Sequence, residues 1–255
     1  MSGTGNTKRA AELFQLQLNS MKMECEISNW SVTEFGDWDE ADAFGFAAPT
    51  HSFREPTVFR KKLKRLPKNQ RGTLPCFLMS SLEGMSGNIF YRIGKILKQK
   101  GMTIIGTYTF YAPSNVLMWQ KSIQRSKEMI TIEHQQNFMR FAKGLPELLR
   151  EKTPIKIKRH LVAGIFASIT RDKMIRWMVR WKIKVDETTC IKCGLCSKNC
   201  IAQCITLEPF PKINMKKCVV CLGCINLCPK DALNSKNTIG LERYKGPGKL
   251  KLQPI

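Results

Sequence analysis

Two stretches decide how this chain folds at its C-terminal end: "CIKCGLCSKNC" at residues 190–200 and "CVVCLGCINLCP" at residues 218–229. Both have the spacing C-x2-C-x2-C-x3-C. Three thiolates two residues apart wrap one cubane iron–sulfur cluster in a tight loop, and the fourth cysteine of each run reaches across to the other cluster. The spacing therefore predicts a small, loop-rich domain that folds around two 4Fe-4S clusters.

The crossed spacing predicts two sets of cysteine ligands. The first set is Cys190, Cys193, Cys196 and Cys228, and the second set is Cys218, Cys221, Cys224 and Cys200. Gly194 and Gly223 suit a backbone that bends closely around sulfur. Structural zinc is the alternative, but zinc sites usually pair two short C-x2-C knuckles across a longer loop, which identical four-cysteine runs do not match.

Residues 185–235 resemble the two-cluster bacterial ferredoxins, with two departures from the family pattern. Ile201 replaces the proline that usually follows the fourth cysteine of the first run, which removes no ligand. Cys204 stands where the family pattern has alanine. Because eight thiolates already satisfy two clusters, we interpret Cys204 as a small buried apolar residue, and a ligand or redox role is the alternative.

The first half of the chain alternates helix and strand patterns, which is typical of a doubly wound α/β domain with a parallel sheet. The predicted strands are residues 42–48, 74–79 and 102–111. The predicted helices are residues 7–18, 56–66, 88–100 and 128–152, the last with an interruption near residues 144–146. We expect an α/β domain at residues 1–152, a basic helical linker at 153–184, the two-cluster domain at 185–235 and a basic tail at 236–255.

The segment "SGTGNT" at residues 2–7 runs directly into the first predicted helix. Hydroxyls and backbone N–H groups at a helix N-terminus form an anion site suited to a phosphate. The segment lacks the residue order of a Walker loop and of a dinucleotide-binding glycine motif. It resembles the phosphate loop of flavodoxins, which binds flavin mononucleotide (FMN), and a plain glycine-rich turn is the alternative.

Two further loops follow predicted strands, at residues 49–53 and 80–87. Open α/β sheets bind their ligands at the carboxyl ends of parallel strands, where both loops are expected to lie. The resemblance to flavodoxins implies that these loops flank the flavin ring. The FMN-binding residues that it implies are Ser2, Gly3, Thr4, Gly5, Asn6, Thr7, Pro49, Thr50, His51, Phe53, Ser80, Ser81, Gly84 and Gly87.

The order of these motifs, together with residues 112–115 and the tail at 242–247, resembles the flavodoxin–ferredoxin fusion proteins of anaerobic bacteria. The resemblance implies an α/β flavodoxin-like doubly wound parallel sheet followed by a small α+β bacterial ferredoxin-like domain, with FMN and two 4Fe-4S clusters as cofactors. A flavodoxin sheet begins with a strand that leads into the phosphate loop. Met1 stands where that strand would end, so either the true start lies upstream or the sheet lacks its first, central strand.

The chain is strongly basic, with a formal net charge of +22. Two clusters of about −2 each would leave a total of about +18. Such a field favours encounters with acidic proteins, nucleic acid or anionic membrane surfaces. We expect an acidic redox protein as partner, because no recognisable nucleic-acid-binding motif is present. Trp177 and Trp181 are interpreted as a packing stripe on a linker helix, with membrane or nucleic-acid contact as the alternative.

No secretory signal opens the sequence, and no apolar run reaches the roughly 20 residues of a membrane span. We therefore predict a cytoplasmic protein with reduced thiols, in which Cys25 and Cys76 are structural. His51 and His160 have no paired nucleophile or carboxylate, so no catalytic residue is predicted, and whether the chain turns over a substrate is left open.

Two functional hypotheses follow from these patterns. In the first, the chain passes single electrons between FMN and two 4Fe-4S clusters and exchanges them with an acidic redox partner. In the second, it is an iron–sulfur electron carrier or complex subunit whose α/β half binds no flavin. A third hypothesis, an iron–sulfur protein that binds nucleic acid, is motivated by the charge alone.

Overall fold

The structure, a computed structural model, describes residues 1–30, 34–35, 38–70, 73–113, 132–169 and 182–247. The α/β part contains α1 (Asn6–Ser20), a short 3-10 turn (Trp38–Glu40), β1 (Phe44–Pro49), α2 (Thr57–Arg65), β2 (Leu74–Leu82), α3 (Ile89–Gln99), β3 (Met102–Tyr111), α5 (Ile132–Glu151) and α6 (Leu161–Ile169). The C-terminal module contains β4 (Lys184–Val185), α8 (Leu195–Lys198), β5 (Ile205–Leu207), β6 (Pro211–Ile213), α9 (Gly223–Asn226) and β7 (Leu233–Asn234).

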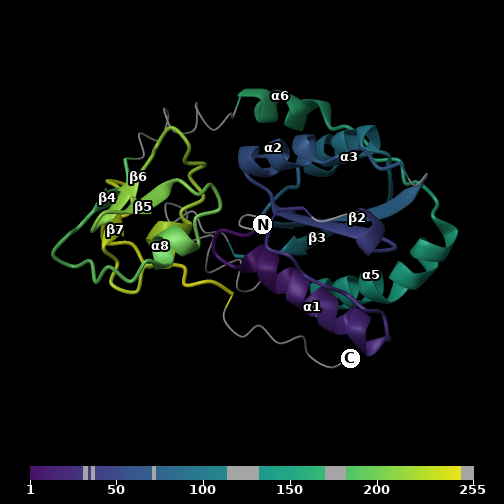
Figure 1. The fold of residues 1–255 in the computed structure, drawn as a ribbon, viewed down its shortest axis with the longest axis horizontal. Helices are drawn as coiled ribbons and strands as arrows, with labels where there is room; N and C mark the ends of the chain where they lie inside the picture. Colours follow the sequence, from purple (N-terminus) through teal and green to yellow (C-terminus); the bar gives the residue numbers. More distant parts are fainter. Residues whose placement is uncertain (31–33, 36–37, 71–72, 114–131, 170–181, 248–255) are drawn as a thin grey trace.

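The α/β part is built on a parallel sheet in the order β1-β2-β3. Every residue of β2 is buried, as expected for a central strand whose two faces are both covered. Helices α2 and α3 lie on one face of the sheet, and α1 and α5 lie on the other (Figure 1). This arrangement is the predicted doubly wound sheet, and it fits an α/β flavodoxin-like fold.

Apolar periodicity explains how each helix meets the sheet. Ile89, Ile93 and Leu97 recur at intervals of four residues along α3, and all are fully buried in the core on one face. Phe138 and Ala142 of α5 have the same spacing and are buried on the opposite face. The two faces therefore have separate apolar cores, with β2 contributing to both.

The structure departs from the sequence prediction at α5, which runs without a break through Pro146. Proline in a helix interior removes a hydrogen bond and costs about 3 kcal/mol. Ala142 and Leu145 before Pro146 are buried in the core, and Leu148 and Leu149 after it pack against the same core. This packing outweighs the local preference. The start of the predicted helix at residues 128–131, and Trp177 and Trp181, lie outside the described residues.

Strand β1 forms one edge of the sheet, and within the described residues no strand precedes it. The backbone nitrogen of Met1 donates a hydrogen bond of 3.1 Å to the carbonyl oxygen of Ala47 at this edge. Met1 also packs against the core that α2 and α3 cover. The N-terminal residue therefore lies at the β1 edge of the sheet.

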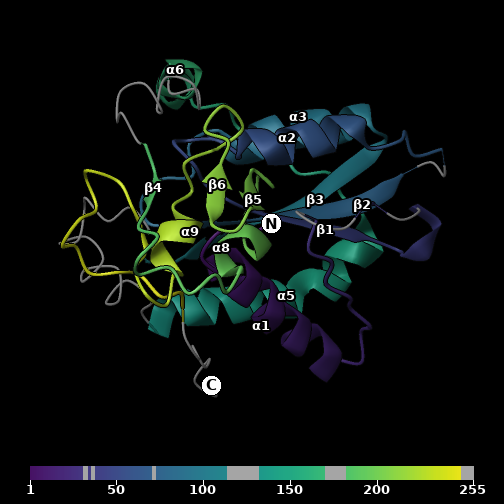
Figure 2. The same cartoon turned by 60° about the vertical axis from the view of Figure 1, so that its left-hand side comes forward.

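The C-terminal module consists of short antiparallel strand pairs and single-turn helices. Strand β4 pairs with β7, and β5 pairs with β6. The first pairing joins Lys184 to Asn234, so both ends of the cysteine-rich segment meet. Helices α8 and α9, one from each cysteine run, contact each other beside β5 and β6 (Figure 2). Among the described residues, no helix is both long and apolar enough to cross a membrane.

Candidate iron–sulfur centre and the glycine loop that covers it

The structure gathers the predicted second set of ligands around one small cavity. Cys200, Cys218, Cys221 and Cys224 all line it, although Cys200 comes from the other cysteine run. The remaining wall is apolar and includes Ile183, Ile205, Ile213 and Leu222. Left-handed residues make the tight turn around the sulfurs possible, with φ of 55° at Val220 and 57° at Leu222.

Three members of the first set, Cys190, Cys193 and Cys196, occupy the equivalent turn of the first run. Cys196 is close enough to Cys190 and Cys193 for the two thiols to raise its pKa, after the larger effect of burial. Lys192 and Gly194 supply the left-handed residues here, with φ of 56° and 73°. Cys228 is buried in the same apolar cluster as Cys196, whereas Cys193 is exposed.

Backbone N–H groups point at three of the predicted ligand sulfurs. Val220 donates to Sγ of Cys218 at 3.3 Å, and Ala232 donates to Sγ of Cys228 at 3.2 Å. The N–H of Cys204 donates to Sγ of Cys200 at 3.4 Å. Such bonds favour the thiolate, the form that binds iron. The turns therefore supply sulfur atoms and stabilise their charge at the same time.

The apolar wall of the cavity raises the pKa of two of these thiols. Burial, with a smaller effect of the neighbouring thiols Cys218 and Cys200, raises the pKa of Cys221 to about 12. Burial also raises the pKa of Cys224 well above its usual value. Buried thiols that crowd one another lose their protons readily only when a cation compensates the charge, as iron does in a cluster. Four sulfurs around an apolar cavity thus fit a 4Fe-4S cluster.

Within the described residues, no group of three or more His, Cys, Asp or Glu side chains converges as for one metal ion. The sulfurs of the second set instead line one small cavity, and a multi-iron cluster binds its thiolates at separate iron atoms. The ninth thiol of the region, Cys204, borders the same cavity, with its Sγ 3.5 Å from that of Cys200. This contact lowers the pKa of Cys200 to about 6 and raises that of Cys204.

The glycine loop at residues 2–7 lies directly against the second cysteine run. A Cβ at Gly3 would lie 3.3 Å from Sγ of Cys221, and a Cβ at Gly223 would lie only 2.6 Å from the carbonyl oxygen of Gly3. On the other side of the loop, a Cβ at Gly246 would lie 2.8 Å from the carbonyl oxygen of Thr4. These glycines are required where the two backbones touch, so the loop is a contact between the two modules.

Side chains of the predicted flavin loops bond to one another. Thr7 and Ser81 share a hydroxyl–hydroxyl bond of 2.7 Å, and Thr50 and Ser80 share one of 2.8 Å. The hydroxyl of Ser2 accepts a bond of 3.1 Å from the N–H of Gly5. The predicted residues do converge at the carboxyl ends of the strands, where β1 pairs Pro49 with Ser81.

The two loops expected to flank the flavin ring also touch. The N–H of Asn88 donates to the carbonyl oxygen of Phe53 at 3.1 Å, and a Cβ at Gly87 would lie 2.5 Å from the same oxygen. His51 is held by a backbone bond to Arg54, and Gly84 is exposed at the tip of its loop. With Gly3 and Thr4 also buried, the residues present do not form an open FMN site in this arrangement.

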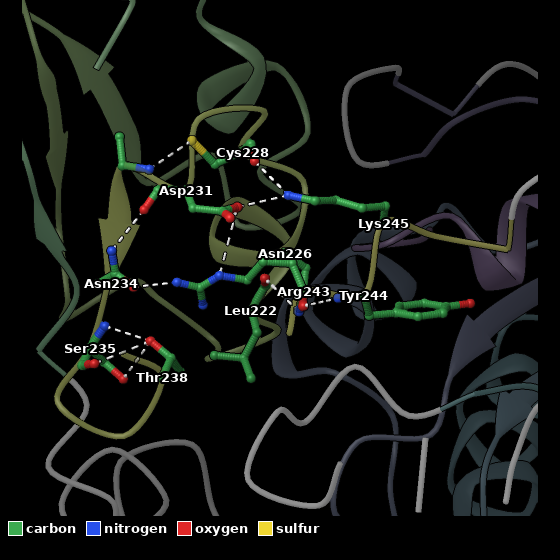
Figure 3. Close-up of polar contacts among 11 residues, drawn as sticks. Leu222, Asn226, Cys228, Asp231, Asn234, Ser235, Thr238, Arg243, Tyr244 and Lys245 are labelled. Atoms are coloured by element: carbon green, nitrogen blue, oxygen red, sulfur yellow. Dashed lines mark hydrogen bonds and ion pairs between the residues drawn. The ribbon is translucent and has the colours of Figure 1, made fainter. Parts of the chain in front are cut away.

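The C-terminal tail supplies contacts that motif reasoning missed. Tyr244 donates its hydroxyl proton to Oδ1 of Asn6, whose Nδ2 donates to the carbonyl of Pro113 at 2.9 Å. The N–H of Tyr244 donates to Oδ1 of Asn226 at 2.9 Å, so this residue joins α9 to the glycine loop (Figure 3). Lys245 donates to the carbonyl of Cys228 at 2.8 Å. The sequence signal was the tail at 242–247, which had no assigned contact.

Comparison with known proteins gives partial similarities. No protein-family model matches the chain. An uncharacterised protein of Methanocaldococcus jannaschii is 37% identical over 62 residues, which are 23% of this chain and 24% of that protein. NADH-quinone oxidoreductase subunit I 2 of Geobacter metallireducens is 32% identical over 75 residues, which are 25% of this chain and 57% of that subunit. The chain thus spans about a quarter of the first relative's length and 57% of the second's.

Among solved structures, a flavodoxin from the domain Archaea is similar, with a TM-score of 0.36 and 18% sequence identity. The similarity covers 50% of this chain and 87% of the flavodoxin.

Proposed function

We propose that the C-terminal module is a ferredoxin-like domain that holds two 4Fe-4S clusters, and that the chain passes electrons one at a time. The observation that carries this proposal is the position of Cys200. It lies in the first cysteine run but borders the same cavity as Cys218, Cys221 and Cys224 of the second run. Crossing of the fourth cysteine is a property of two-cluster modules, and a single-ion site does not require it.

The similarity to a subunit of an NADH-quinone oxidoreductase supports a redox role for this chain. A bound cluster would supply one-electron chemistry, since such clusters exchange electrons singly. The chain's own residues would hold two such clusters through eight thiolates, four to each cluster. The apolar wall of Ile183, Ile205 and Leu222 would exclude water, and the N–H bonds to sulfur would set the electrostatic environment.

In this function the α/β part serves as a rigid support that presents the cluster module. Gly3 contacts Cys221, and Tyr244 joins Asn6 to Asn226, so the module is attached across the carboxyl end of the sheet. Attachment through a buried backbone contact and a hydrogen-bonded tyrosine keeps the module in one orientation. A carrier or complex subunit of this kind needs no flavin.

A second candidate function, electron exchange between FMN and the clusters, is supported by the convergence of loops 2–7, 49–53 and 80–87 at the carboxyl ends of the strands. This candidate requires the contact between Gly3 and Cys221 to open. Assay of flavin in the purified protein, before and after incubation with excess FMN, separates the two candidates. Stoichiometric FMN supports the exchange function, and its absence in both samples rejects that function.

We also propose an acidic redox protein as the electron-transfer partner, because the chain carries a net charge of +22. The association rate with an acidic ferredoxin should then fall steeply as salt is added, measured by stopped flow with reduced protein. A rate that does not change with salt would contradict a charge-steered encounter.

The crossed ligand set provides the direct test of the proposed function. Cys200→Ala should remove the cluster held by the second set and leave about four irons per chain, measured on anaerobically purified protein. Cys25→Ala, which changes a cysteine outside the module, is the matched control and should retain about eight irons. Full iron content in Cys200→Ala would show that Cys200 is not a ligand.

A further inference from the structure

A cleft of about 890 Å³ lies between the α/β part and the C-terminal module. One wall comes from α2 and from Arg92 of α3, and α6 contributes Ala167 and Ser168. The opposite wall comes from the cysteine module, through Ala202, Val219 and the two lysines before Cys218. Figure 1 shows α2 and α6 at the end of the α/β part nearest this module. We call this space the basic cleft.

Cationic side chains dominate the walls of the basic cleft. They are Arg60, Lys61, Arg65, Arg92, Lys216 and Lys217, together with the buried Arg54. The described residues that line the cleft include no Asp or Glu. Like charges gathered in a concave site repel one another, and a concave wall focuses their field on any anion inside. The composition therefore indicates an anionic ligand.

Two of the guanidinium groups are held in place by a buried carboxylate. Glu55 is fully buried, and its oxygens lie 3.0 Å from Nε of Arg92 and 3.2 Å from Nε of Arg60. Both arginine side chains keep about a quarter of their surface exposed at the cleft. Because the carboxylate fixes their orientation, little side-chain entropy remains to be lost when an anion binds.

Helix α2 adds a further attraction for anions. The helix begins at Thr57, directly after Pro56, and no side chain forms a capping hydrogen bond at its N-terminus. Thr57 and Val58 line the cleft, so the positive end of the helix dipole lies near its wall. Arg54 fixes the neighbouring wall by donating to the carbonyl of Ala167 at 3.0 Å.

We propose that the basic cleft binds a small organic anion with two or more phosphate groups, and that this ligand bridges the two modules. Guanidinium pairs and helix N-termini match phosphate oxygens, and the volume lies in the range of about 300–1,000 Å³ typical of small-molecule sites. Arg60 and Arg92 line the cleft and keep only about a quarter of their side-chain surface exposed, which a small ligand inside the cleft can contact. None of the predicted FMN-binding residues lines the cleft, and the proposal does not depend on the proposed electron transfer.

Calorimetric titration of the cluster-loaded protein with inorganic pyrophosphate and with ADP tests this proposal. Each probe should bind with a stoichiometry of one. Lys61→Glu combined with Lys217→Glu reverses one charge on each wall and should weaken binding about tenfold or more. Both side chains are exposed, so folding should survive, and the iron content of each variant checks the module.

Lys64→Glu combined with Lys198→Glu is the matched control, because these exposed lysines of α2 and α8 are not among the residues that line the cleft. The control should leave both dissociation constants within about threefold of the parent value. Equal weakening in both double variants would show attraction by net charge only and would overturn the proposal. Three other results would also overturn it. They are that neither probe binds, that binding of the probes does not saturate, or that an acidic protein binds at the cleft while pyrophosphate and ADP do not.

Discussion

Cys204 is the one cysteine of the C-terminal module that is not a predicted cluster ligand, and its thiol contacts a predicted ligand. Its Sγ lies 3.5 Å from Sγ of Cys200, and both Cys200 and Cys218 raise its pKa, so Cys204 holds a proton beside two predicted ligands. The raised pKa of Cys204 keeps that proton in place. The prediction from sequence was a small buried apolar residue, and the structure confirms the burial while adding a hydrogen bond to the ligand sulfurs.

We expect Cys204→Ala to lower the reduction potential of the cluster held by the second set, because hydrogen bonds to sulfur stabilise the reduced, more negative cluster. A potentiometric titration followed by electron paramagnetic resonance measures the shift, with Cys25→Ala as control. Retained iron with a lower potential supports a tuning role. Loss of about four irons would instead make Cys204 a ligand.

Gly223 lies where the backbones of the two modules are in close contact. A Cβ there would meet the backbone oxygen of Gly3 at 2.6 Å, and a backbone atom cannot rotate away as a side chain can. Gly223→Ala should therefore destabilise the protein by about 1–3 kcal/mol, measured as a lower midpoint of thermal unfolding. Gly84→Ala, where a Cβ meets nothing within 4 Å, is the control and should leave the midpoint almost unchanged. An unchanged midpoint for Gly223→Ala would mean that the modules do not pack this way.

At the scale of elements, Tyr244 of the tail connects α9 to the glycine loop through hydrogen bonds to Asn226 and Asn6. Burial raises the pKa of Tyr244 to about 12, compared with about 10 for an exposed tyrosine. Between these values the folded protein keeps a proton that the unfolded chain has lost, so stability falls as pH rises from about 10 to about 12.

Tyr244→Phe should lower the free energy of unfolding by about 1 kcal/mol at neutral pH, because Asn6 and the module lose a buried hydrogen bond. Urea unfolding at a series of pH values should also show that the free energy of unfolding declines less above about pH 10 in this variant than in the parent. Parallel declines in the two proteins would show that Tyr244 is not buried in the folded state.

Elements with strong periodicity were predicted well from the sequence. Strands β1, β2 and β3 and helices α1, α2 and α3 lie within a few residues of their expected positions, because apolar spacing there agrees with burial. Helix α5 was predicted less well, since the turn preference of Pro146 is local and the packing of Ala142 and Leu145 is not. Neither the pairing of β4 with β7 nor the single-turn helices had a periodic signal to reveal them.

At the scale of the whole molecule, the candidate site could be predicted only in part. The spacing of the cysteine runs predicted that Cys200 would join Cys218, Cys221 and Cys224, since the cluster imposes that geometry. The packing of the glycine loop against the second cysteine run could not be predicted, because it depends on contact between Gly3 and Gly223, which lie far apart in sequence. The basic cleft could not be predicted either, because its walls come from both modules and the sequence shows only their total charge.

The central claim is that this chain holds two 4Fe-4S clusters, and cofactor analysis of anaerobically purified protein tests it most directly. Iron, acid-labile sulfide and zinc are measured on one sample, and electron paramagnetic resonance is recorded after reduction by dithionite. The account predicts about eight irons and eight sulfides per chain, with the signal of two reduced clusters that interact magnetically. Zinc in place of iron, or about four irons with a single isolated signal in the unaltered chain, would contradict it.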